Sequence, residues 1–144
     1  MGIAFTIGRI FIPIFFVVAG IQNAMNIGEL SKMVADTNIP IPDQIVPYLA
    51  GIPKYDALAY LFVAIEIICG LLILAGLKAR WAALILVVYT ACSIFFIHHF
   101  WDGMSGADMI MHRTEALKDL SIIGGLLLVV AVGSGPAALD RDRN

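Results

Sequence analysis

The feature that most constrains this chain is a set of four apolar runs, each long enough to cross a bilayer. A hydrocarbon core of about 30 Å is crossed by about 20 apolar residues at the helical rise. The runs do not alternate apolar and polar residues, so we expect helices, which satisfy their backbone hydrogen bonds internally, rather than a barrel. The predicted spans cover residues 3 to 24, 57 to 76, 82 to 101 and 116 to 133.

The composition supports a membrane protein. Of the 144 residues, 60% are hydrophobic and only 14% are charged, whereas soluble domains have about 25% charged residues. The formal net charge of -2 provides no basic surface, which excludes a nucleic-acid partner. The fold predicted is an all-α integral membrane four-helix bundle, a single domain over residues 1 to 133, followed by a polar tail at 134 to 144. The first span lacks the basic start and the small-residue cleavage site of a signal peptide, so we expect it to remain.

Residues 25 to 56 form a long connection between the first two spans. Within "NIGELSKMVADTNIPIP" the apolar residues Ile27, Leu30 and Val34 share one helical face, whereas the charged residues lie elsewhere. This pattern predicts a short amphipathic helix in the membrane interface, ended by Asn38 and Pro40. A surface loop with one helical turn is the alternative interpretation.

Four crossings place both termini on one side of the membrane. Lysines and arginines are almost equally divided between the two sides, so the usual comparison gives nearly a tie. The short "GLKAR" turn, with Lys78 and Arg80, and Arg9 near the start of the first span break the tie. We therefore expect cytoplasmic termini.

Glu66 is the most costly residue in the spans. It lies near the middle of the second span, about 15 Å from water on either side, so its carboxyl group has to be paired, hydrated or protonated. Arg9 and Asn23 share one face of the first span, and we expect Arg9 to pair with Glu66. In the alternative interpretation Arg9 extends to the lipid headgroups and Glu66 is protonated.

Two adjacent histidines end the third span. Neighbouring helical positions point about 100° apart, so His98 and His99 cannot both face the bundle, and we expect His98 to face inward. At the same depth lie Gln22 and Asn23 at the end of the first span and Lys118 and Asp119 at the start of the last. Together they would form a polar vestibule above Glu66. Alternatively, the histidines and Trp101 belong to an interfacial belt of anchoring side chains.

Other reactive or small residues predict packing rather than chemistry. Cys69 and Cys92 lie inside spans and form no CxxC motif, so we interpret them as packing residues. A metal site is not expected, because the adjacent histidines lack the i, i+4 spacing of a helical ligand pair. Small residues in the last span would allow a neighbouring helix to approach closely: Ser121, Gly124 and Gly125.

The segments "GRIFIPIFFVVAGIQN", "IEIICGLLILAGLKARWAALIL", "FFIHHFWDG" and "EALKDLSIIGGLLLV" resemble successive blocks of the bacterial DoxX family. The resemblance covers all four spans and implies a small four-helix protein of the bacterial inner membrane. The family includes DoxD-type subunits similar to the membrane part of thiosulfate:quinone oxidoreductase and members linked to quinone and thiol stress. Gln22 and Asn23 stand where many relatives have a lysine, which removes a cation near the vestibule.

The resemblance and the polar residues together predict a quinone-linked membrane subunit of an oxidoreductase system. Glu66 and His98 would be the catalytic residues, since a carboxyl group and an imidazole can supply protons. The quinone-binding residues would be Arg9, Asn23, His98, Trp101 and Lys118. The chain has no flavin, haem or metal motif, so electrons would come from a partner protein; self-association is left open. The alternatives are a non-catalytic assembly subunit and a small transporter or lipid-headgroup binder.

Overall fold

The computed structural model describes residues 2–37, 39–42, 44, 47, 49, 51–98, 101 and 105–135. These residues form helices and no strands, which confirms the all-α fold. The tail predicted at 134 to 144 lies almost entirely outside the described residues, as do Asn38 and His99. The five helices are α1 (Gly2–Met25), α2 (Ile27–Asp36), α3 (Lys54–Ala75), α4 (Ala79–Phe96) and α5 (Gly106–Val132).

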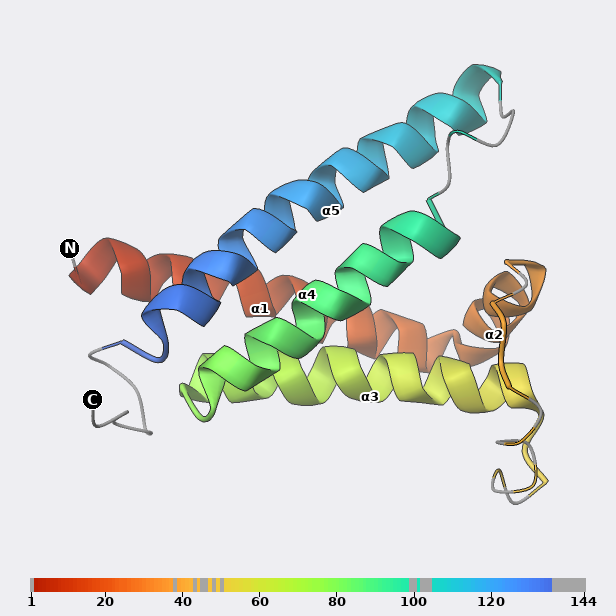
Figure 1. Ribbon diagram of the computed structural model, residues 1–144, viewed down its shortest axis with the longest axis horizontal. Coiled ribbons are helices and arrows are strands. Elements are labelled where there is room, and N and C mark those ends of the chain that lie inside the picture. Colours follow the sequence, from red (N-terminus) through yellow and green to blue (C-terminus); the bar gives the residue numbers. More distant parts are fainter. Residues whose placement is uncertain are drawn as a thin grey trace.

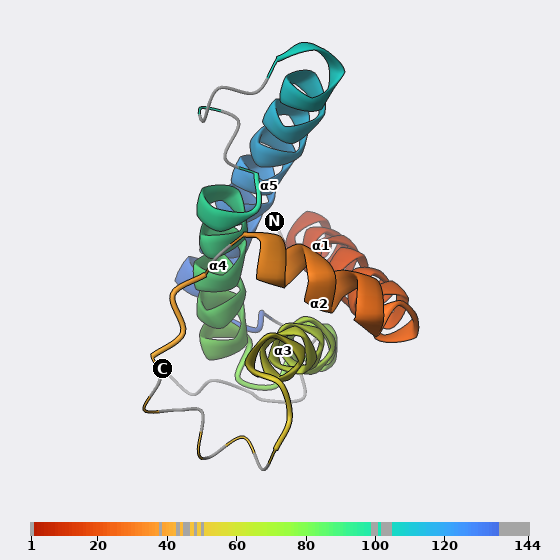
Figure 2. The same cartoon turned by 90° about the vertical axis from the view of Figure 1, so that its right-hand side faces the viewer.

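The four long helices form two antiparallel pairs, α1 with α3 and α4 with α5, and the pairs cross where α3 meets α4 (Figure 1). The start of α1, the α3–α4 turn and the end of α5 lie at one end of the molecule. Figure 2 views the opposite end, where α2 lies above α3 and between α1 and α4. We call this second end the α2 end.

Within the described ranges, three helices are long and apolar enough to cross a membrane: Phe5–Met25, Lys54–Ala75 and Ala79–Phe96. They match the first three predicted spans, except that α4 ends five residues before the predicted limit at 101. In α5 charged residues extend to Asp119, and the uncharged part from Leu120 to Val132 is only about 20 Å long. The fourth crossing at 116 to 133 therefore stays a prediction.

A tight turn makes α3 and α4 neighbours. Gly76 closes α3 in the left-handed conformation with φ 68°, which glycine adopts without steric cost. The amide of Leu77 then donates to the carbonyl of Leu72 at 2.9 Å, the hydrogen bond of a Schellman motif. The chain thus reverses within the "GLKAR" segment, as its length requires.

The predicted amphipathic helix is present as α2. Its buried residues are Leu30 and Val34, the apolar face that the sequence indicates, and they pack against Ala59 and neighbouring side chains of α3. The hydroxyl of Ser31 also donates to the carboxylate of Asp56 at the start of α3. This face of α2 therefore rests on protein.

Glycines set the distance between α1 and α3. A Cβ atom at Gly20 would lie 3.0 Å from the Cβ of Glu66, and one at Gly70 would lie 2.8 Å from a methyl carbon of Val17 and 3.2 Å from the carbonyl oxygen of Pro13. Both are closer than ordinary van der Waals contact, so these positions exclude larger residues. The contact between Gly20 and Glu66 also shows that these two residues lie at the same position along the axis of the α1–α3 pair.

The small residues of α5 are used unequally. A Cβ atom at Gly125 would lie 2.7 Å from Ile12, so Gly125 does allow α1 to approach. A Cβ atom at Gly124 would have no atom within 4 Å, and Ser121 is exposed and bonds to its own helix. Within the described part of the chain, the predicted role in close packing between helices is therefore confirmed only for Gly125.

We predict that Gly70→Ala lowers the free energy of unfolding by about 1–3 kcal/mol, because the new methyl group collides with Val17 and the Pro13 carbonyl. Helix propensity alone favours alanine by about 1 kcal/mol, so the expected sign is opposite to that of propensity. Thermal unfolding in detergent micelles measures the change. Gly124→Ala is the matched control and should be neutral or stabilising; equal melting temperatures for the two variants would contradict the close α1–α3 contact.

Candidate functional site

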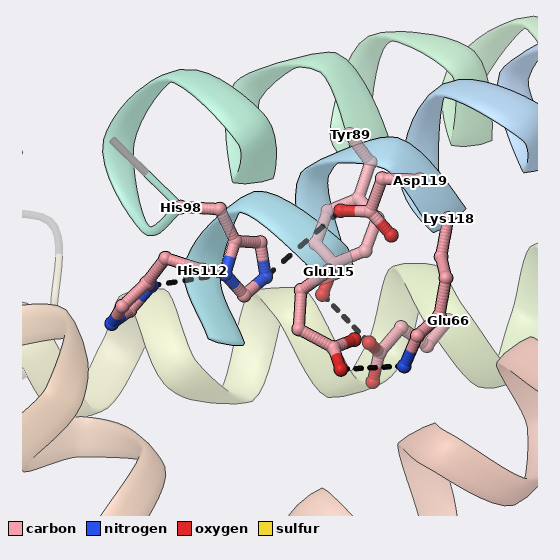
Figure 3. A network of polar contacts seen from close by, with 7 residues as sticks. All are labelled: Glu66, Tyr89, His98, His112, Glu115, Lys118 and Asp119. Carbon is pink, nitrogen blue, oxygen red and sulfur yellow. Dashed lines mark hydrogen bonds and ion pairs between the residues drawn. The ribbon is translucent and has the colours of Figure 1, made fainter. Parts of the chain in front are cut away.

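The carboxylate of Glu66 is held between two helices. Glu66 is only 4% exposed, and each of its oxygens accepts one hydrogen bond. The hydroxyl of Tyr89 on α4 donates to Oε1 at 2.6 Å, as Figure 3 shows, and the side-chain amide of Asn23 on α1 donates to Oε2 at 2.9 Å. These donors compensate for the lost hydration of the carboxyl group.

Arg9 does not pair with Glu66, so this prediction is wrong. Its guanidinium is 3% exposed and donates to the carbonyl oxygen of Ser134 at 2.5 Å. Because Glu66 is level with Gly20, Arg9 lies about 16 Å further along the α1 axis, beside the end of α5. The alternative in which Arg9 reaches the headgroups does not describe this buried side chain either.

His98 connects the end of α4 to α5. Its Nδ1 lies 3.4 Å from Nδ1 of His112, and its Nε2 lies 4.0 Å from a carboxylate oxygen of Asp119. His98 therefore faces a neighbouring helix within a row of groups that can exchange protons (Figure 3).

Lys118 and Trp101 lie at the margin of this region. Lys118 is exposed and forms an ion pair with Glu115 at 2.5 Å. Trp101 is 50% exposed, and its ring centroid lies 6.0 Å from that of Phe95, an exposed residue of α4. The structure therefore places Trp101 on the outer surface, where the alternative of an interfacial anchor fits it better.

A cavity of about 410 Å³ lies beside Glu66, towards the α2 end. Three of the predicted site residues line it: Glu66, Asn23 and His98. The other three, Arg9, Trp101 and Lys118, do not. Further polar and acidic side chains also line it, namely Gln22, Asn26, Glu29, Glu115 and Asp119, together with apolar side chains such as Phe15, Phe16, Leu30 and Ile97. A more open hollow of about 730 Å³ shares His98, Ile97 and Glu115 with it.

Thr90 supplies an unused hydrogen-bonding group at this cavity. The residue is 2% exposed and lines the cavity, and within the described part of the chain its hydroxyl has no hydrogen-bond partner. A buried hydroxyl without a partner costs about 1–3 kcal/mol. Such a group needs an explanation, and an acceptor on a bound ligand would provide one.

The sequence reasoning missed two site residues, Tyr89 and Thr90. A usable signal was present, because Tyr89, Thr90 and Ser93 are polar residues inside an otherwise apolar span, and polar groups in a span face the bundle interior. Among the described residues no three histidine, cysteine, aspartate or glutamate side chains converge closely enough to hold a metal ion. The polar side chains that line the cavity can exchange protons or form hydrogen bonds.

We predict that Tyr89→Phe destabilises the protein by about 1–3 kcal/mol, because one oxygen of the buried Glu66 carboxylate loses its donor. The aromatic ring stays in place and keeps its edge contact with Phe62, 5.4 Å between centroids. Unfolding monitored by circular dichroism in micelles measures the loss.

Tyr60→Phe on the exposed face of α3 is the matched control, and its expected change is within about 0.5 kcal/mol. Equal stability of the two variants would show that the Tyr89 hydroxyl does not stabilise Glu66.

The similarity of this chain to known proteins supports a membrane protein. The family model described as DoxX matches residues 4–99. The Surfeit locus protein 4 homolog of Schizosaccharomyces pombe is 30% identical over 76 residues, which are 52% of this chain and 25% of that protein. The chain thus matches about a quarter of that relative's length. No solved structure matches the chain significantly.

Proposed function

Because this chain belongs to the DoxX family and has three helices suited to crossing a bilayer, we propose that it is a membrane subunit that binds a quinone headgroup in the cavity beside Glu66. In this proposal the subunit serves a quinone-linked oxidoreductase system. The observation that carries the proposal is the unpartnered hydroxyl of Thr90 in the same cavity as the Glu66–Tyr89 hydrogen bond.

The chemistry of the cavity suits a quinone ring. A quinone is flat and apolar apart from two carbonyl oxygens, which accept hydrogen bonds but cannot donate them. Beside its acidic residues, the cavity supplies apolar wall from Phe15, Phe16 and Ile97, and hydrogen-bond donors in the hydroxyl of Thr90 and the imidazole of His98. A ligand carbonyl settled against α4 would give the Thr90 hydroxyl its missing acceptor.

Reduction of a quinone to the quinol takes up two electrons and two protons. In this proposal Glu66 and His98 supply the protons, and the carboxylate of Glu66 takes up a proton before it passes one to the quinone. His98, with Asp119 and His112 beside it, would carry protons from the α2 end of the molecule. The electrons would come from a redox partner protein that carries a flavin, a haem or an iron–sulfur centre.

The proposal places the protein in the bacterial inner membrane with cytoplasmic termini. Residues of α2 line the cavity, and α2 lies at the opposite end from the start of α1 (Figure 1), so the cavity would be nearer the outer face of that membrane. Protons would then enter from that side. A redox partner would dock on the same side, within reach of the ring, and self-association remains compatible with this arrangement.

We predict that Thr90→Val weakens quinone binding about tenfold while leaving the free protein equally stable or more stable. Valine has nearly the shape of threonine, and the hydroxyl that it removes has no partner in the protein, so only the bound state loses a hydrogen bond of about 1.4 kcal/mol. Equilibrium binding of a short-chain quinone to the protein in lipid nanodiscs, together with a thermal melt, measures both effects.

Thr114→Val on the exposed face of α5 is the matched control and should leave binding unchanged, since the Thr114 hydroxyl bonds to its own helix. Failure of the unmodified protein to bind any quinone would sink the proposal and favour the assembly-subunit alternative. Equal binding by the Thr90 variant and the unmodified protein would remove Thr90 from the site.

A further inference from the structure

A second cavity of about 150 Å³ lies against α3 and α4. Its wall is almost wholly apolar: Leu58 and Phe62 come from α3, Cys92 and Phe96 from α4, and Ile39 from the segment after α2. Apolar cavities of this kind stay free of water and accept hydrocarbon. The chemistry of the wall therefore differs sharply from that of the cavity beside Glu66.

The two cavities share part of their wall. Tyr89, Ser93 and Ile97 line both, and because these residues are four positions apart they lie along one stripe of the α4 side. Tyr89 turns its hydroxyl to Glu66 and packs its ring edge-on against Phe62. One side chain thus borders the polar site with its hydroxyl and the apolar cavity with its ring.

We propose that the apolar cavity holds the first part of the isoprenoid tail of the quinone whose ring occupies the cavity beside Glu66. This inference rests on the proposed function and adds the class of substrate, a quinone with a long hydrocarbon tail. A polar cavity with donors and an adjoining cavity lined by carbon atoms match the two halves of such an amphiphile. The shared stripe on α4 is where the ring would meet the tail.

The tail contributes to the binding free energy through packing contacts and not through the hydrophobic effect. In a bilayer the free tail is already surrounded by hydrocarbon, so burying it in protein gains packing contacts but little hydrophobic free energy. The expected effect of the tail is therefore moderate. Its main consequence is to set the orientation of the ring against Tyr89 and Glu66.

The experiment compares two probes and two variants in nanodiscs of one phosphatidylcholine. The probes are a benzoquinone without a tail and the same ring with a decyl chain. Leu58→Trp fills the apolar cavity, and Leu61→Trp adds the same side chain on the exposed face of the same helix. Equilibrium binding is measured by extracting the bound quinone and reading its absorbance.

We expect Leu58→Trp to weaken binding of the decyl quinone about tenfold and binding of the tail-less quinone less than about twofold. Leu61→Trp should change neither. If Leu58→Trp weakens both probes equally or weakens neither, the tail site is overturned while the proposed quinone site stands. If the unmodified protein binds neither probe, the proposed function fails and the inference fails with it.

Cys92 provides a second measurement that does not depend on the folding of a filled variant. In a Cys69→Ser background, the rate at which N-ethylmaleimide labels Cys92 reports whether the apolar cavity is occupied. The decyl quinone should slow labelling several-fold, and the tail-less quinone should not. Equal rates with both probes would overturn the inference.

Discussion

The buried carboxylate of Glu66 constrains how the helices are arranged towards the α2 end of the bundle. A charge in a span is tolerated only where neighbouring helices supply donors, and here α1 contributes Asn23 and α4 contributes Tyr89. Both donors require their helices at fixed depth and rotation. The same placement of the helices therefore produces the two hydrogen bonds to Glu66, the close α1–α3 contact at Gly20 and the position of the cavity.

Local sequence patterns predict the elements of this fold well. The apolar runs correspond to α1, α3 and α4, and the apolar face of α2 is the one that the spacing of Leu30 and Val34 indicates. These features depend on residues within a few turns of one another. Periodicity therefore contains the necessary information.

Relationships between helices were harder to predict. Arg9 and Glu66 are each recognisable as costly residues, yet whether they meet depends on how far α1 slides along α3, and glycine contacts set that register. The sequence pattern does not single out Tyr89, because the ring of a tyrosine also suits the apolar interior of a span. When the residue is buried, however, its hydroxyl needs a hydrogen-bond acceptor. The candidate site is thus partly predictable from the sequence: its acid, its imidazole and Asn23 are recognisable, whereas Tyr89 and Thr90 on α4 are not.

The buried guanidinium of Arg9 has a mechanical consequence. Together with the contacts of Ile12 with Gly125 and of Phe5 with Gly135, its bond to Ser134 fastens α5 to α1 at the end remote from α2. Separating the helices there would break a hydrogen bond of a buried cation, which is costly. We therefore expect any separation of the helices to be larger at the α2 end, where the cavities lie.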